Sequence, residues 1–180
     1  MKYRGLFFLI IIFSHQFTCY CQNDRNIVKL TYDIFLMKNN YDKTHKQTLL
    51  FKNSLVDELT NLNLDFLISS YSKIENETLI DFKRKMWLTI NHCGYDLGDF
   101  DCISSDFLPN SIDDVISKYP NWNRILYKVS NIGYNEKKTQ AILYYSFKYY
   151  NTNNYGASFL VFKKKGERWK LKKIIPVTAS

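Results

Sequence analysis

The chain has 180 residues, and its 25 Lys and Arg against 17 Asp and Glu give a formal net charge of +8 at pH 7. A hydrophobic share of 46% excludes an intrinsically disordered chain, and three Pro with six Gly exclude collagen-like and linker sequences. We expect one domain, because globular domains typically run to about 100–200 residues. No apolar run reaches the roughly 18 residues that a transmembrane helix needs, so the sequence predicts no transmembrane segment.

Residues 1–21 have the layout of a secretory signal peptide. Lys2 and Arg4 precede an unbroken apolar run at residues 6–13, and a short polar stretch follows at residues 14–18. The apolar run is too short to cross a bilayer as a helix. We therefore expect export to the periplasm, the cell envelope or the extracellular space.

The end of this leader contains two cysteines that indicate a cleavage point. Signal peptidase prefers small side chains one and three residues before the cut, which Cys21 and Cys19 provide, so the mature chain is expected to start at Gln22. A lipid anchor on one of these cysteines is the alternative, although neither follows the small residue that usually precedes an acylated Cys. A buried structural segment is the third interpretation.

Cleavage at this point leaves a mature chain of net charge +6 with two cysteines, Cys93 and Cys102. In an oxidising compartment such a pair is read first as a disulfide, and closing a loop of about ten residues would stabilise the fold by roughly 2–3 kcal/mol. Two free buried thiols are the alternative. The spacing matches no zinc pattern, and only His45 and His92 remain to complete one, so we predict no metal site.

The first part of the mature chain predicts mainly helices. Apolar residues recur at helical spacing in four segments, and short apolar runs between them suggest strands. Pro120 should stop the last of these helices at the residue before it. The predicted helices cover residues 24–40, 54–66, 76–85 and 111–119, and the predicted strands cover 46–53 and 87–90.

The remainder alternates as a β-meander. The predicted strands are residues 124–134, 139–150, 157–165 and 168–177, joined by turns at 135–138 and 166–167 and by a polar loop at 151–156. Four strands with one apolar face need a cover, which the preceding helices can supply. The sequence therefore predicts a single α+β domain over residues 22–180, with a C-terminal four-stranded antiparallel β-meander covered by N-terminal helices.

Alternation also predicts the faces of these strands. In the second strand one face should pack inward, and the face that carries Gln140, Ser146 and Lys148 should meet water. The inward set is Ala141, Leu143, Tyr145, Phe147 and Tyr149. In the last strand the phase breaks at Lys173-Ile174, which predicts a bulge or a strand end.

Several motifs resemble those of small uncharacterised exported bacterial proteins of the Bacteroidota type. These proteins carry a Tyr-Pro, a Ser-x-x-Gly-Phe-Asn, a Thr-x-Ala-Leu strand and a closing Gly-Lys-Trp-Lys. The matching segments here are Tyr119-Pro120, residues 130–135 with Tyr134 in place of Phe, residues 139–142 with Ile142 in place of Leu, and residues 166–170. The resemblance covers about the last 60 residues and implies export and this fold, but no activity. The closing Trp strand is also similar to nuclear-transport-factor-2-like domains, whose cone is the alternative fold.

The sequence offers little for catalysis. His45 and His92 are the only histidines of the mature chain, and no phosphate-binding loop, HExxH or GxSxG motif is present, so we predict no catalytic residue and no cofactor. The densest acidic cluster lies around two glycines and is read as a solvated loop. Binding of Ca²⁺ and glycoside hydrolysis by paired carboxylates stay open for it. Its members are Asp96, Asp99, Asp101 and Asp106.

Charge is divided unevenly along the chain. Residues 54–114 hold 12 acidic and 4 basic side chains, a net of −8, whereas residues 137–173 hold 10 basic and 1 acidic, a net of +9. The basic segment could attract an acidic partner, or it could solubilise a sheet face and discourage edge pairing. Export argues against nucleic acid as that partner.

Aromatic residues crowd the second strand and the loop after it. Tyr144 and Tyr150 alternate with the predicted core set and are expected to be exposed, where rings can stack on sugars or peptides. With Tyr155 and Lys148 they form the predicted ligand-binding residues. Plain packing within the sheet is the alternative, because Tyr is a good strand former.

The leading functional hypothesis is therefore a non-enzymatic binding or accessory module that recognises a protein, peptide or glycan of the cell envelope. The alternatives are a small envelope hydrolase that uses the acidic loop 96–106, and a structural envelope protein without a ligand.

If the leader is processed as predicted, the mature protein begins at Gln22. Intact-mass spectrometry and N-terminal sequencing of the protein from its producing cell check this. An uncut precursor in the cytosol would contradict export, and an acylated Cys19 or Cys21 would favour the lipid anchor.

Overall fold

The computed structural model describes residues 25–31, 47–51, 64, 67, 70–86, 100–104, 112–120, 122–150, 152 and 154–177. The chain divides into two compact units, Met1–Tyr41 and Asp42–Ser180. In the first, residues 25–31 are helical, and Thr31 Oγ1 donates a hydrogen bond to the carbonyl oxygen of Ile27 at 2.8 Å. This confirms the predicted first helix over those seven positions. None of the helices within the described ranges has the length and apolar character to cross a membrane.

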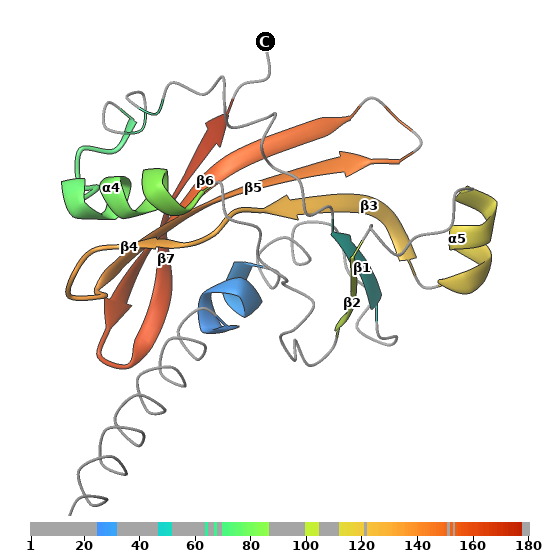
Figure 1. Cartoon of the computed structure of the whole chain (residues 1–180), viewed down its shortest axis with the longest axis horizontal. Helices are drawn as coiled ribbons and strands as arrows, with labels where there is room; N and C mark the ends of the chain where they lie inside the picture. The colour runs from blue at the N-terminus through green and yellow to red at the C-terminus, as the bar shows by residue number, and fades with distance from the viewer. Residues whose placement is uncertain are drawn as a thin grey trace, which may run out of the picture. The chain divides into compact units, whose positions relative to one another are not determined.

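The second unit is built on one sheet with the strand order β2-β1-β3-β5-β6-β7 (Figure 1), which begins with β2 (Phe100–Ser104) and β1 (Gln47–Phe51). Its antiparallel part consists of β3 (Trp122–Val129), β5 (Gln140–Tyr149), β6 (Tyr155–Lys165) and β7 (Arg168–Val177). The helix α4 (Asn76–Lys85) lies against the short strand β4 (Gly133–Tyr134) and against β5. The predicted α+β class with a C-terminal antiparallel meander is confirmed.

The sheet differs from the prediction at its first strands. The segment predicted as one strand from 124 to 134 divides into β3 and the short β4 (Gly133–Tyr134), which pairs with β5. The predicted strand at 46–53 is β1 (Gln47–Phe51), and β2 (Phe100–Ser104), which no alternation indicated, pairs parallel with it. The helix predicted at 54–66 lies outside the described residues apart from position 64, and the strand predicted at 87–90 lies outside them entirely.

The helix before β3 ends where proline requires it. This helix, α5 (Ile112–Lys118), is followed by Tyr119, whose amide bonds the carbonyl of Val115 at 2.8 Å, and then by Pro120. The amide of Trp122 in turn bonds the carbonyl of Tyr119 at 3.0 Å. The Pro120 turn therefore leads directly from α5 into β3.

The predicted irregularity in the last strand is a β-bulge. Val161 pairs with Lys173 and Phe162 pairs with Leu171, so Lys172 has no partner in the ladder. An extra residue on one strand shifts the phase of its side chains, which is the physical reason for the break at Lys173-Ile174 in the sequence pattern.

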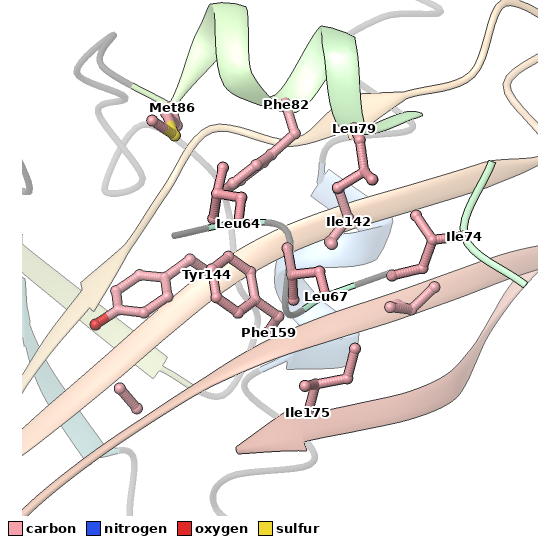
Figure 2. Packing of buried hydrophobic residues seen from close by; sticks show 12 residues of the cluster. Leu64, Leu67, Ile74, Leu79, Phe82, Met86, Ile142, Tyr144, Phe159 and Ile175 are labelled. Carbon is pink, nitrogen blue, oxygen red and sulfur yellow. The ribbon is translucent and has the colours of Figure 1, made fainter. Parts of the chain in front are cut away.

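The helix α4 packs on the sheet through one apolar stripe (Figure 2). Leu79 and Phe82 point from the helix toward the side chains of β5, β6 and β7, and Met86, directly after the helix, belongs to the same buried cluster. The rings of Phe82 and Phe159 meet edge to face, with centroids 5.7 Å apart. The sheet side of this cluster includes Ile142, Tyr144, Phe159, Val161 and Ile175.

The predicted division of β5 into a dry face and a wet face is wrong. Every residue from Gln140 to Ser146 is buried, so the sheet is covered on both sides along most of this strand. The side that α4 covers carries Ile142 and Tyr144, which is the side predicted to meet water. Of the residues predicted to meet water on this strand, Lys148 near its end is the one that is exposed.

A carboxylate fixes the helix to β4. Asp81 accepts hydrogen bonds from Lys85 Nζ and Arg84 Nη2, both at 2.6 Å, and from the backbone N–H of Tyr134 at 2.9 Å. Burial alone raises the pKa of Asp81, but the bonds and charge from these groups outweigh it and hold that pKa below its ordinary value of 3.8. The ionised carboxylate therefore contributes stability above pH 4, which is lost as the pH falls through the lowered pKa.

A second polar link joins the start of α4 to the turn before β5. Gln140 is fully buried; its Oε1 accepts from the amide of Glu75 at 2.7 Å, and its Nε2 donates to the carbonyl of Lys73 at 2.9 Å. Asn135, also buried, donates to Glu75 Oε2 at 2.6 Å and accepts from the amides of Thr139 and Gln140. The side-chain amides of Gln140 and Asn135 both donate and accept hydrogen bonds, and a shift of the helix along the sheet would break these bonds. They therefore fix one position of α4 relative to β5.

The close approach of α4 to β4 requires glycine at position 133. A Cβ there would lie 2.4 Å from Cβ of Phe82 and 2.5 Å from its backbone nitrogen. Neither atom can move without displacing the helix.

We predict that Gly133→Ala lowers the free energy of unfolding by about 1–3 kcal/mol or more through this overpacking. Gly166→Asn is the matched control: Gly166 has φ +60° with open space around it, and Asn tolerates that conformation, so its cost should stay below about 1 kcal/mol. Urea unfolding midpoints compare the two. Equal midpoints would show that the helix does not sit on Gly133.

Candidate functional site

The predicted ligand-binding residues lie around the loop between β5 and β6. The amide of Tyr149 bonds the carbonyl of Asn154 at 3.1 Å, which closes the loop, and the amide of Tyr150 bonds the carbonyl of Arg124 at 2.9 Å. Lys148 and Tyr155 are direct partners across the ladder and therefore share a face. We call the exposed residues Lys148, Tyr150 and Tyr155 the hairpin-end site.

Tyr150 rests on a buried tryptophan. Its side chain is 51% exposed, and its ring meets that of Trp122 edge to face with centroids 5.7 Å apart. Trp122 is held in turn by a hydrogen bond from Nε1 to the carbonyl of Ile125 at 3.0 Å and by packing against Val115 of α5. Leu126, the ladder partner of Lys148, belongs to the same cluster, so Tyr150 lies on the same side of the sheet as Lys148.

Tyr155 rests on a buried tyrosine. Tyr155 is 39% exposed, and its hydroxyl lies 3.1 Å from the hydroxyl of Tyr144. Tyr144 is 1% exposed and packs on Phe159 at a centroid distance of 5.2 Å, and its backbone amide donates a hydrogen bond to Ser130 Oγ at 2.9 Å. The expectation that Tyr144 is exposed is therefore wrong: it supports Tyr155 from the core that Figure 2 shows.

The opposite side of β5 carries an aromatic ladder. The ring of Phe147 stacks on Tyr145 at 5.9 Å and meets Tyr149 edge to face at 5.7 Å. It also covers Gly156, where a Cβ would lie 2.6 Å from two of its ring carbons. Burial, followed by the nearby Tyr127 and Tyr149, raises the pKa of Tyr145, so the hydroxyl of Tyr145 stays uncharged at neutral pH.

The structure thus brings three of the four predicted residues together as an exposed group and assigns the fourth, Tyr144, to support. Sequence reasoning missed Trp122. The sequence did contain an indication of its role, because Trp122 comes directly after the Pro120 turn and begins a strand. A large ring at such a position can fill the space between a helix and the end of a sheet.

The remaining predicted site residues are only partly placed. Asp101 and Cys102 lie in β2, so residues 100–104 are not the loop that was predicted. Asp96, Asp99, Asp106, Cys93, His45 and His92 lie outside the described residues. The disulfide between Cys93 and Cys102 and the uses of the acidic cluster therefore stay predictions. Among the side chains that the structure describes, no group of three or more His, Cys, Asp or Glu could hold a metal ion.

The chain matches no protein-family model, no curated protein and no solved structure.

The burial difference among the tyrosines predicts a difference in stability. Tyr144→Ala should lower the free energy of unfolding by about 3–5 kcal/mol, as for other buried rings, and Tyr144→Phe by about 0.5–1.5 kcal/mol through loss of the hydroxyl contact. Tyr155→Ala should cost less than about 1 kcal/mol, because that ring is partly in water. Chemical denaturation of the three variants measures this. A Tyr144→Ala variant as stable as Tyr155→Ala would place the ring of Tyr144 outside the core.

Proposed function

We propose that this protein is an exported, non-enzymatic binding module of the cell envelope that recognises a peptide or glycan segment of its partner at the hairpin-end site. One observation carries the proposal: two exposed tyrosines flank one loop, and each is braced by a buried aromatic residue, Trp122 for Tyr150 and Tyr144 for Tyr155. Rings held in place lose little conformational freedom on binding.

The chemistry of the site suits such a ligand. The free side of a tyrosine ring can stack on a sugar ring or a peptide group, and the Tyr150 hydroxyl and the Lys148 ammonium can donate hydrogen bonds to hydroxyl or carbonyl oxygens. Tyr150 and Tyr155 are two of the three large hydrophobic residues that are exposed in the described part of the chain; the third is Ile80 on α4, at 59%.

Export and membership of the Bacteroidota-type family form part of the same proposal. The charged and apolar segments of residues 1–21 support export, and the turn and strand motifs between Tyr119 and Lys170 support the family. An envelope partner follows from these two features together.

Titration with soluble cell-wall oligosaccharides and with a panel of unstructured peptides tests the function, read by backbone NMR shifts. We expect the shifts of a binding probe to centre on Lys148, Tyr150 and Tyr155. The double variant Tyr150→Ala/Tyr155→Ala should lower its affinity about fivefold or more, because an aromatic anchor typically contributes over 1 kcal/mol.

Ile80→Ala is the control, since it removes from α4 the other large apolar side chain that is exposed in the described part of the chain. Affinity unchanged in the double tyrosine variant, or lost equally in the control, would contradict the proposal.

A further inference from the structure

The far end of the β6–β7 hairpin carries a second surface of different character. We call residues 163–173 the basic hairpin end. This segment holds six Lys and one Arg against a single acidic residue, Glu167 at the turn. Side chains at 165, 168, 170, 172 and 173 are exposed, and those at 163 and 164 are partly exposed.

The strand register places like charges opposite one another. Lys163 pairs with Lys170, and Lys165 pairs with Arg168. Directly opposed like charges destabilise a sheet. The bulge increases the density of charge further, because it inserts Lys172 beside Lys173.

Acidic side chains neutralise little of this charge. Lys163 Nζ lies 3.9 Å from Glu75, and Lys164 Nζ lies 3.8 Å from Glu167, whose side chain is 98% exposed. Across the described residues no ion pair involves Lys165, Arg168, Lys170, Lys172 or Lys173. The surface therefore has most of its positive charge available to a ligand.

Protection of the sheet edge explains only part of this pattern. β7 is an edge strand, and lysines there discourage pairing with another chain. β6, however, is bonded on both sides, and Lys163 lies between Gln140 of β5 and Lys170 of β7. Edge protection does not require the cations on β6 that oppose those on β7.

We propose that the basic hairpin end binds an anionic polysaccharide, one that bears sulfate or carboxylate groups along its chain. The cations form a grid with spacings of roughly 5 Å across the strands and about 7 Å along them, which suits a linear polymer with repeated charges. Lysine predominates over arginine, which favours point-charge attraction over the bidentate geometry that arginine provides.

Other polyanions fit the surface less well. A membrane surface would call for apolar side chains that insert, but the large exposed ones in the described chain are Ile80, Tyr150 and Tyr155, all outside this segment. Single-stranded nucleic acid would call for exposed rings on which bases stack, and Trp169 is buried, at 7% exposure. The surface is separate from the hairpin-end site, because Tyr155 begins β6 and Lys165 ends it.

Binding of the purified protein to dextran sulfate tests the proposal, with neutral dextran of the same length as the reference. We expect binding to dextran sulfate alone, weakening steeply as salt rises. Lys165→Gln/Lys170→Gln should weaken it by about tenfold and lower the salt slope by one to two. This variant relieves both opposed pairs, Lys163 with Lys170 and Lys165 with Arg168, so its melting temperature should not fall. Tyr150→Ala/Tyr155→Ala should bind dextran sulfate normally.

The control Lys29→Gln/Lys118→Gln removes the same charge from exposed positions elsewhere. If both double variants lost the same affinity for dextran sulfate, binding would depend on net charge alone, and the proposal would be overturned. Tighter binding to a short DNA duplex or to anionic phospholipid vesicles than to dextran sulfate would overturn the choice of polysaccharide. Unchanged affinity with aggregation of Lys165→Gln/Lys170→Gln would assign these lysines to edge protection alone.

Discussion

The contact between Phe82 and Gly133 is the constraint on which the rest of this structure depends. Because position 133 has no Cβ, the backbone of α4 can approach β4 and insert Phe82 against Phe159. The carboxylate of Asp81, next to Phe82, then accepts a hydrogen bond from the amide of Tyr134. At the start of the helix, the side-chain oxygen of Gln140 accepts a hydrogen bond from the amide of Glu75. Apolar packing supplies most of the stabilisation, while these directed bonds fix where along the sheet the helix lies.

The position of α4 decides which tyrosine is structural and which is available. The helix covers the part of the face that carries Ile142 and Tyr144, as Figure 2 shows, and leaves Lys148 and Tyr155 exposed. The Tyr144 hydroxyl marks the boundary, since it belongs to a buried ring yet contacts the exposed Tyr155. At the start of β3, Trp122 packs on α5 and is buried, while its ring contacts the exposed Tyr150. Two proposed binding surfaces thus stand at opposite ends of β6, one aromatic and one basic.

Local chemistry made much of the fold predictable. Pro120 predicted the end of α5, alternation predicted β5 to β7, and the phase break at Lys173 predicted the bulge. Alternation assigns residues to two faces but does not say which face a helix covers, and Tyr suits either environment, so the exposure of Tyr144 was predicted wrongly. The parallel pairing of β1 with β2 was also beyond reach, because it joins segments about fifty residues apart and β2 lies among aspartates.

Native-state hydrogen exchange at the Tyr134 amide tests the seating of α4 most directly. This amide donates to Asp81 at 2.9 Å, so it reports on the contact between helix and sheet. If α4 is seated as described, the amide exchanges only through global unfolding, with the same protection as the central amides of β5 and β6. Exchange at the rate of an unstructured peptide, while β5 and β6 stay protected, would mean that the helix does not hold Tyr144 in the core, and would contradict the account.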